Sequence, residues 1–325
     1  MTAPMMHLED ALLLTRDRNV LMGGDSRLNR LAARGELLQI RRGAYIPVST
    51  WRSMNYDARY RMHVFAVART RRIEPVFSSY SAAVLWGLPI VGPWPRDVHV
   101  LAERSSGGRS DPGIRRHAVG MPSTLVRTAE GLVVTDVART IVDIAAQSTF
   151  VSGVAAADFA LHRGLVTREE LRSVWSDLLP FRGSRQASGV IEFATPLSGS
   201  VAESVSLVNM ARHRFPRPIL QQEFVHPSGH SYFVDFWFKR CRRIGEVDGR
   251  IKYSDPAYLR GRTPAQALWD EKQREDWLRT QCDGFGRWPW EVANSAGALC
   301  RRLLELGVPQ LPFGHPDGFL VMPPR

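Results

Sequence analysis

Lysine is nearly absent from this sequence. The 43 lysine and arginine residues include only three lysines, Lys239, Lys252 and Lys272. The formal net charge of +11 and the pI of about 10.3 are therefore carried almost entirely by guanidinium groups. A large positive charge favours polyanions as partners, and guanidinium groups suit bidentate contact with phosphate and guanine. The composition predicts DNA as a partner.

Cysteine is also scarce, and so are long apolar runs. The three cysteines, Cys241, Cys282 and Cys300, are widely spaced and form no CxxC pair. This pattern argues against a disulfide framework and against a structural zinc site. The first residues lack the charged start and apolar core of a signal peptide. No apolar run approaches the roughly 20 residues of a membrane span. We expect a cytoplasmic protein with no membrane partner.

The length of 325 residues allows two or three domains, and a hydrophobic content of 44% supports packed cores. Helix-like and strand-like patterns both occur along the chain, which predicts the α/β (α+β) class.

The first 50 residues have the order of a winged helix. Leu8, Ala11, Leu12 and Thr15 predict one face of a first helix. A second helix is expected to run to Arg34 and to end at Gly35. Two strands around the turn at residues 41–43 then follow.

The arginines of this winged helix are the predicted DNA contacts. The second helix would enter the major groove, where Arg27 and Arg30 would reach bases or phosphates. Arg41 and Arg42 would contact the DNA backbone. The alternative is a structural winged helix that docks onto a protein.

The stretch 231–253, SYFVDFWFKRCRRIGEVDGRIKY, predicts a β-hairpin that carries carboxylates. A turn centred between residues 240 and 241 places Asp235 opposite Glu246, and Phe233 opposite Asp248. Like charges in opposite positions are unfavourable unless a cation or a proton lies between them. Mg²⁺ prefers such oxygen ligands, at roughly 2.0–2.1 Å. The alternative is an edge hairpin with solvated carboxylates, each offset by a nearby arginine.

Glu203 lies ahead of this hairpin, in the pattern Ser200-x-x-Glu203. This pattern is a capping box, in which the glutamate satisfies the N-terminus of a helix. This pattern by itself predicts that Glu203 is a helix cap.

The spacing D-x(10)-E-x-D-G, behind a helix that bears a glutamate, resembles the PD-(D/E)xK nuclease superfamily. More narrowly, it resembles the very-short-patch-repair-type endonucleases. The resemblance implies that Asp235 and Glu246 bind the metal, with Glu203 and Asp248 beside them. Asp248 stands where the superfamily has a lysine. The nearest lysine is Lys252, to which the electrostatic role would then pass.

The N-terminal run Gly35, Leu37, Arg42, Gly43 and Tyr45 resembles the N-terminal domain of AbiEi-type antitoxins. The stretches SSYSAAVLWGLP and TDVARTIVDIA resemble the central domain of AbiEi-like proteins. These resemblances divide the chain into a winged helix at 1–50, a central α/β domain at 51–150, a helical linker at 151–194 and a restriction-endonuclease-like α/β domain at 195–325.

Together these features predict a DNA-binding protein with a Mg²⁺-dependent endonuclease domain in a toxin–antitoxin or phage-defence setting. In that mechanism the ion would lower the pKa of a bound water and neutralise charge on the phosphate. The main alternative is a catalytically silent, antitoxin-like repressor. A third is a protein that neutralises a toxin directly. The expected partners are DNA, a cognate toxin and a second copy of the chain.

Overall fold

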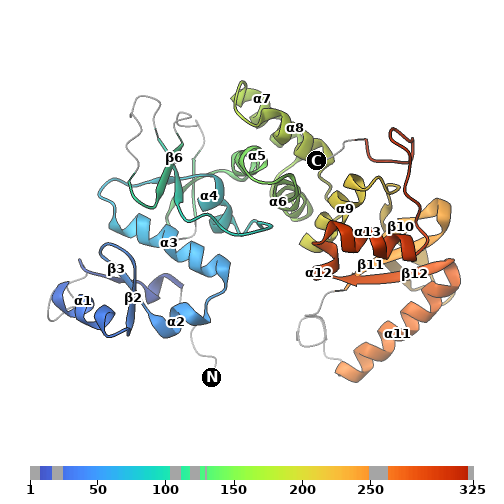
Figure 1. The fold of residues 1–325 in the computed structure, drawn as a ribbon, viewed down its shortest axis with the longest axis horizontal. Helices are drawn as coiled ribbons and strands as arrows, with labels where there is room; N and C mark the ends of the chain where they lie inside the picture. The colour runs from blue at the N-terminus through green and yellow to red at the C-terminus, as the bar shows by residue number, and fades with distance from the viewer. Residues whose placement is uncertain are drawn as a thin grey trace. The chain divides into compact units, whose positions relative to one another are not determined.

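The computed structural model describes residues 8–16, 25–102, 111–117, 125–128, 130–248 and 263–320. The chain forms two compact units, Met1–Gln147 and Ser148–Arg325. Within the described residues, helices accompany three sheets (Figure 1), which confirms the predicted mixed α/β class. The predicted four-part division is finer than these two units and stays a prediction.

The first unit begins with a small three-stranded sheet in the order β1-β3-β2. Its elements, with the helices that follow them, are η1 (Leu8–Ala11), β1 (Leu13–Leu14), α1 (Asp25–Ala33), β2 (Leu37–Arg41), β3 (Ala44–Pro47), α2 (Val48–Ser53) and α3 (Tyr56–Thr70). The predicted second helix and the two strands are confirmed. Gly35 ends α1 with a φ of +76°, which favours glycine.

The predicted first helix is wrong beyond its first turn. Only Leu8–Ala11 is helical, as a 3-10 turn, and Leu13 and Leu14 form a short strand. This strand pairs with β3, where Leu13 lies opposite Tyr45. Backbone pairing with a neighbouring strand has overridden the helical spacing of the apolar residues.

A five-stranded sheet in the order β6-β5-β4-β8-β7 completes the first unit. Its elements are β4 (Val76–Phe77), α4 (Ser79–Trp86), β5 (Val98–Leu101), β6 (Ile114–His117), β7 (Leu125–Arg127), β8 (Val133–Thr135) and α5 (Val137–Gln147). One hydrophobic core joins this sheet to α3, with Phe65 and Phe77 among its buried members.

The second unit opens with α6 (Phe150–His162), α7 (Arg168–Leu178) and α8 (Ser184–Phe193). The rest follows the order helix, three strands, helix, strand. Its elements are α9 (Val201–Arg212), β9 (Ile219–Val225), β10 (Ser231–Phe238), η2 (Lys239–Cys241), β11 (Arg243–Asp248), α11 (Pro264–Gln281), β12 (Gly284–Pro289), α12 (Trp290–Ala293) and α13 (Ala296–Glu305).

The sheet of this unit has the order β12-β11-β10-β9. Strands β9, β10 and β11 are antiparallel neighbours, whereas β12 runs parallel to β11 because α11 carries the chain back between them. The predicted hairpin is present as β10 and β11.

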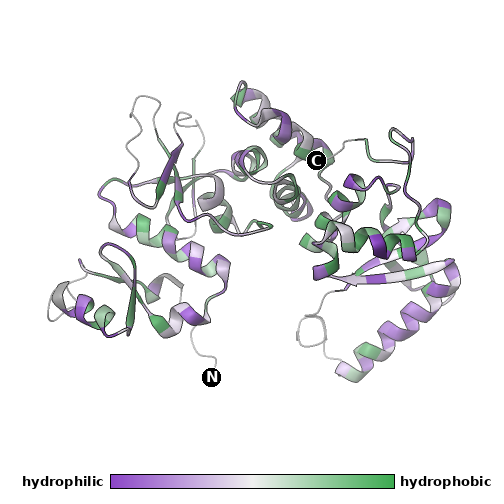
Figure 2. Cartoon of the chain, viewed as in Figure 1, coloured by the Kyte–Doolittle hydropathy of each residue, from purple (hydrophilic) through white to green (hydrophobic). Residues whose placement is uncertain are grey.

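Helices cover both faces of this sheet. Leu207 of α9 and Leu303 of α13 pack with Phe236 and Trp288 on one face. Leu278 of α11 packs with Trp237, Ile244 and Phe285 on the other face. The remaining surface of α11 is largely hydrophilic, as Figure 2 shows. Within the described ranges, no helix combines the length and apolarity needed to cross a membrane.

Candidate functional site

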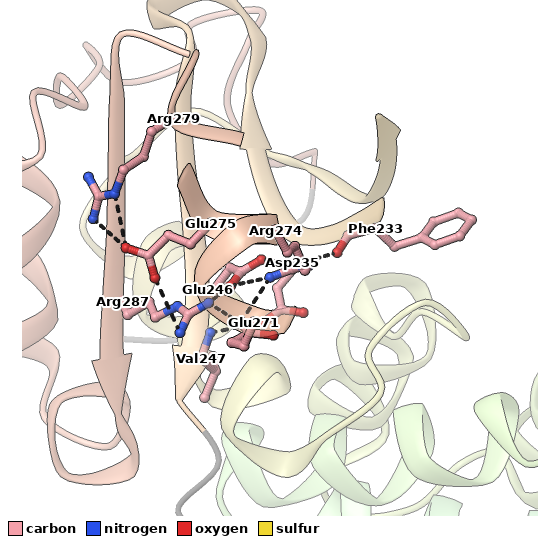
Figure 3. Close-up of polar contacts among 9 residues, drawn as sticks. All are labelled: Phe233, Asp235, Glu246, Val247, Glu271, Arg274, Glu275, Arg279 and Arg287. Atoms are coloured by element: carbon pink, nitrogen blue, oxygen red, sulfur yellow. Dashed lines mark hydrogen bonds and ion pairs between the residues drawn. The ribbon is translucent and has the colours of Figure 1, made fainter. Parts of the chain in front are cut away.

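The β10–β11 hairpin has the register that its sequence predicts. Phe236 pairs with Gly245 and Trp237 pairs with Ile244, so the same register continued by one residue sets Asp235 beside Glu246. The backbone N–H of Val247 donates to Asp235 Oδ2 over 2.8 Å (Figure 3). The two carboxylates therefore come from adjoining strands and lie in one part of the structure.

Gln221 links Asp235 to Glu203. Its Nε2 lies 3.4 Å from Asp235 Oδ1 and 3.3 Å from Glu203 Oε2. Gln221 has a φ of +49°, an uncommon conformation for a residue other than glycine. Backbone pairing between β9 and β10 skips this position, since Gln222 and Leu220 pair with their partners on either side of it. A neutral amide thus stands between two carboxylates.

Glu203 caps α9, which is one of its two predicted roles, and its role in a metal site stays a prediction. Ser200 Oγ accepts from the backbone N–H of Glu203 over 3.2 Å, as in a capped helix. Glu203 Oε1 accepts from Ser200 Oγ (2.8 Å), and Oε2 accepts from the backbone N–H of Gly199 (2.9 Å). The same Oε2 faces Gln221. The carboxylate therefore caps α9 and also lies beside Asp235's hydrogen-bond partner.

Glu246 is paired with two arginines from neighbouring elements (Figure 3). Arg274 of α11 contacts both of its oxygens, with Nη1 3.2 Å from Oε2, and Arg287 of β12 places Nη2 3.1 Å from Oε2. Arg274 also donates to the carbonyl of Phe233 over 2.7 Å. The Glu246 side chain is only 9% exposed, so this pairing takes place largely out of water.

Further carboxylates complete an ion-pair network on α11. Glu271 contacts both Arg274 and Arg287, and Glu275 contacts Arg287 and Arg279. Burial by itself lowers the pKa of Arg274, but the hydrogen bond and charge of Glu246 outweigh it and the pKa is raised. The pKa of Arg287 is raised for the same reason, since the charges of Glu246 and Glu271 outweigh its burial. Both guanidinium groups stay charged.

This network bears on the metal hypothesis. Both oxygens of Glu246 already face guanidinium groups, so a divalent ion at Glu246 would meet two fixed positive charges. Within the described ranges, no three histidine, cysteine, aspartate or glutamate side chains form a group that could hold a metal ion. Arg274 and Arg287 supply the counter-charge of Glu246 in this arrangement. Mg²⁺ binding stays a prediction.

One of the other two predicted catalytic residues, Asp248, lies at the end of β11. Asp248 is the last residue of the strand and is exposed. Lys252 lies outside the described residues. The hairpin spacing predicted Asp235 and Glu246, but it gave no sign of Gln221 or Arg287. Arg274 could have been found, because it lies one helical turn from Glu271.

The predicted DNA-contacting arginines fall into two groups in the first unit. Arg27 and Arg30 are exposed on α1, whose Leu28 is buried against Leu37 and Tyr45. Arg34, just past the helix, is also exposed. The spacing 27, 30, 34 places the three guanidinium-bearing residues on one helical face.

The turn between β2 and β3 holds the other two arginines, which differ from each other. Arg42 is exposed. Arg41 is partly buried and donates to Thr70 Oγ1 over 3.1 Å and to the carbonyl of Pro112 over 3.4 Å. Sequence alone does not show that Arg41 and Arg42 differ in burial and in hydrogen bonding.

In one unit, a helix with exposed arginines lies next to a two-stranded hairpin. In the other unit, a hairpin carries carboxylates, and arginines supply their counter-charge. Comparison with known proteins adds a family likeness. Residues 80–193, about a third of the chain, match the family model described as the AbiEi antitoxin C-terminal domain. This match confirms the AbiEi-like part of the resemblance drawn from the sequence, over the segment from α4 to α8.

Two curated relatives from Mycobacterium tuberculosis are similar to part of this chain. They are described as the uncharacterized proteins MT2308 (strain CDC 1551 / Oshkosh) and Rv2248 (strain H37Rv). Each is 28% identical over 174 residues, which is 51% of this chain and 63% of the relative. A solved structure, that of the Rv2827c protein from Mycobacterium tuberculosis, covers 67% of this chain and 84% of its own at 15% identity. Its TM-score of 0.34 is too low to assign a common fold.

Proposed function

We propose that this chain is a DNA-binding regulator of the antitoxin type, whose first unit contacts duplex DNA through α1. The observation that carries the proposal is that Arg27 and Arg30 are exposed on α1, with Arg34 exposed just past its end, while Leu28 of the same helix is buried. The likeness of residues 80–193 to an antitoxin domain supports the setting. The net charge of +11 supports a polyanionic partner.

The test is the salt dependence of binding to duplex DNA. Each phosphate contact lowers the slope of log K against log[salt] by about 0.9. We expect Arg27→Ala together with Arg30→Ala to weaken binding and to make the slope shallower. Arg172→Ala together with Arg185→Ala, which removes the same two charges from exposed arginines of the second unit, is the matched control. Equal loss in the control would leave only non-specific charge and would remove α1 from the proposal.

For the second unit, the proposal is a nuclease-like domain in which arginines have replaced the metal ion as partner of Glu246. The helix that bears Glu203 precedes the hairpin, as in the resemblance to the nuclease superfamily, and Asp235 and Glu246 stand on adjoining strands of the hairpin. Arg274 and Arg287 supply the counter-charge of Glu246. This combination favours the catalytically silent alternative.

The second candidate is the active one, a Mg²⁺-dependent DNA endonuclease. The proximity of Asp235 to Glu246, with Glu203 reached through Gln221, favours it. The ion would supply an activated water and charge neutralisation at the phosphate. Incubating supercoiled plasmid with Mg²⁺ or Mn²⁺ decides between the two. We expect no cutting. Cutting by the wild type that disappears in Asp235→Asn would establish the nuclease instead.

The partners of the predicted regulator belong to the same proposal. An antitoxin-type protein would have a cognate toxin, and a homodimer would suit a palindromic DNA site. Sedimentation of the full chain measures its oligomeric state. Co-expression with the products of adjacent genes, followed by co-purification, tests for the toxin.

A further inference from the structure

The turn between β2 and β3 is packed against the body of the first unit. Gly43 has a φ of +81°, and its carbonyl accepts from the backbone N–H of Thr15 over 3.1 Å. A Cβ atom at Gly43 would lie 3.2 Å from Thr15 Oγ1 and 4.0 Å from Thr70 Cγ2. The turn therefore lies against the C-terminal end of α3.

Arg41 holds the turn in this place from its side chain. Its Nε donates to Thr70 Oγ1 (3.1 Å) and its Nη1 to the carbonyl of Pro112 (3.4 Å). The Thr70 hydroxyl donates its own proton to the carbonyl of Ala66 over 2.6 Å. A lone pair of Thr70 Oγ1 is therefore directed at Arg41. One guanidinium group thus connects the turn to α3 and to the segment before β6.

The groups around Arg41 suit a residue that fixes the turn in place better than a residue that contacts a DNA phosphate. Asp111 pairs with Arg71 (2.8 Å) and with Arg116 (3.0 Å), which fixes the segment before β6 to the end of α3. Burial and the nearby charge of Arg71 lower the pKa of Arg41, and Asp111 offsets part of this effect. Arg42, the next residue, is exposed and carries its charge on the surface.

We propose that Arg41 is a positioning residue, which fixes the turn so that Arg42 is presented to DNA, and that Arg41 does not itself contact phosphate. This inference rests on the proposed DNA-binding function and assigns the two arginines of the turn different roles. A guanidinium group is needed at this position because its donors are held apart in a plane and reach two separate acceptors at once. The ammonium of a lysine is one compact group.

The experiment compares four variants on a random-sequence duplex of about 30 base pairs over a range of salt concentrations. Arg41→Ala is expected to weaken binding roughly threefold to tenfold, the size of effect that one lost hydrogen-bonding group has, with an unchanged salt slope. Arg41→Lys keeps the charge and should behave like Arg41→Ala. Thr70→Val removes the acceptor without changing any charge and should also weaken binding. Arg42→Ala should make the slope shallower by about 0.9.

Hydrogen exchange measured without DNA tests the anchoring separately. Exchange of the amides at 42–45 should become faster in both Arg41→Ala and Thr70→Val. A shallower slope in Arg41→Ala, with Thr70→Val unchanged in affinity and exchange, would make Arg41 a phosphate contact and overturn the inference. If binding of the wild type to the duplex does not depend on salt, the proposed DNA-binding function is wrong. The proposed role of Arg41 in presenting Arg42 to DNA is then wrong as well. The exchange rates would still decide whether Arg41 anchors the turn.

Discussion

His117 Nε2 lies 2.9 Å from His99 Nδ1, on the neighbouring strands β6 and β5. Only one hydrogen can occupy such a contact, so the contact is lost when both rings are protonated. Burial lowers the pKa of His99 to about 3, with further lowering by His117 and Arg115. Burial and Arg115 likewise lower the pKa of His117 to about 4.

This pair predicts acid sensitivity of the first unit. Both folded-state pKa values lie below the ordinary value of about 6.5. The two histidines therefore make their full contribution to stability above that pH, and this contribution is lost as pH falls toward 4. The loss for His99 alone is roughly 2 to 3 kcal/mol at a pH of about 4.5, at 1.36 kcal/mol for each pKa unit. Calorimetry from pH 7.5 downward measures it. His117→Gln should flatten the pH dependence, and an equally steep decline in that variant would contradict the assignment.

Asp158 predicts the opposite pH dependence in the second unit. Its Oδ1 accepts from the backbone N–H of Thr195 (2.6 Å) and its Oδ2 from Ser204 Oγ (2.7 Å). Burial raises the pKa of Asp158 to about 7, against the lowering effect of these hydrogen bonds. A raised folded-state pKa means that stability is highest when the carboxyl is protonated and falls as pH rises from about 4 to about 7.

Asp158→Asn should remove this dependence, because the amide does not ionise. Across that pH range, the difference in free energy of unfolding between the wild type and the variant should change by an amount on the order of 3 kcal/mol. Urea denaturation at several pH values measures it. Asp177→Asn, at an exposed position of α7, is the matched control and should follow the wild type. Parallel curves for Asp158→Asn and the wild type would show that Asp158 does not titrate there.

The sequence predicted local elements well where one physical signal dominated. Gly35 and the following residues gave the end of α1 and the two strands, because a glycine with positive φ and alternating side chains leave few other choices. The register of the β10–β11 hairpin, with Phe236 opposite Gly245, followed from the length of the turn. The helix expected near Leu12 failed because pairing with β3 is a long-range contact that local spacing does not contain.

The partners of the candidate site lay beyond the reach of sequence. Gln221 and Glu203 are 18 residues apart, and Arg287 pairs with Glu246 only because β12 returns parallel to β11. The same limit applies to Arg41, which looks identical to Arg42 until Thr70 is placed beside it. Spacing identifies which strand faces carry charge, but the tertiary fold decides which charges meet.

The Glu246–Arg274 pair should behave as a coupled unit. Removing one partner of a buried ion pair costs about 3–5 kcal/mol. Arg274→Met leaves Arg287 beside Glu246, so we expect a smaller loss, about 2 kcal/mol. The double variant with Glu246→Gln should lose less free energy of unfolding than the two single variants together. The reason is that it no longer holds a Glu246 carboxylate that lacks part of its counter-charge. Urea denaturation of all four proteins gives the coupling energy. Strict additivity would mean that the two side chains do not interact.

Gly245 of β11 should tolerate no side chain, because Trp288 of the neighbouring strand lies against its backbone. A Cβ atom there would come within 2.8 Å of Trp288 Cζ3 and closer still to Cη2. The indole has little room to move, since it stacks on Phe236 at 5.5 Å and donates from Nε1 to Ser206 Oγ over 3.0 Å. Gly245→Ala should therefore destabilise the second unit by about 1–3 kcal/mol, the usual result of overpacking.

Gly297 in α13 is the matched control for this substitution. Among the described residues, a Cβ atom at Gly297 would meet only Arg301 Nη1, at 3.8 Å. Because alanine favours the helical backbone, Gly297→Ala should raise stability by up to about 1 kcal/mol. Trp288→Phe should restore part of the stability lost in Gly245→Ala, because the smaller ring gives the new methyl group space. Thermal denaturation of these variants measures both effects. If Gly245→Ala is as stable as the wild type, the close contact between β11 and Trp288 is not as described.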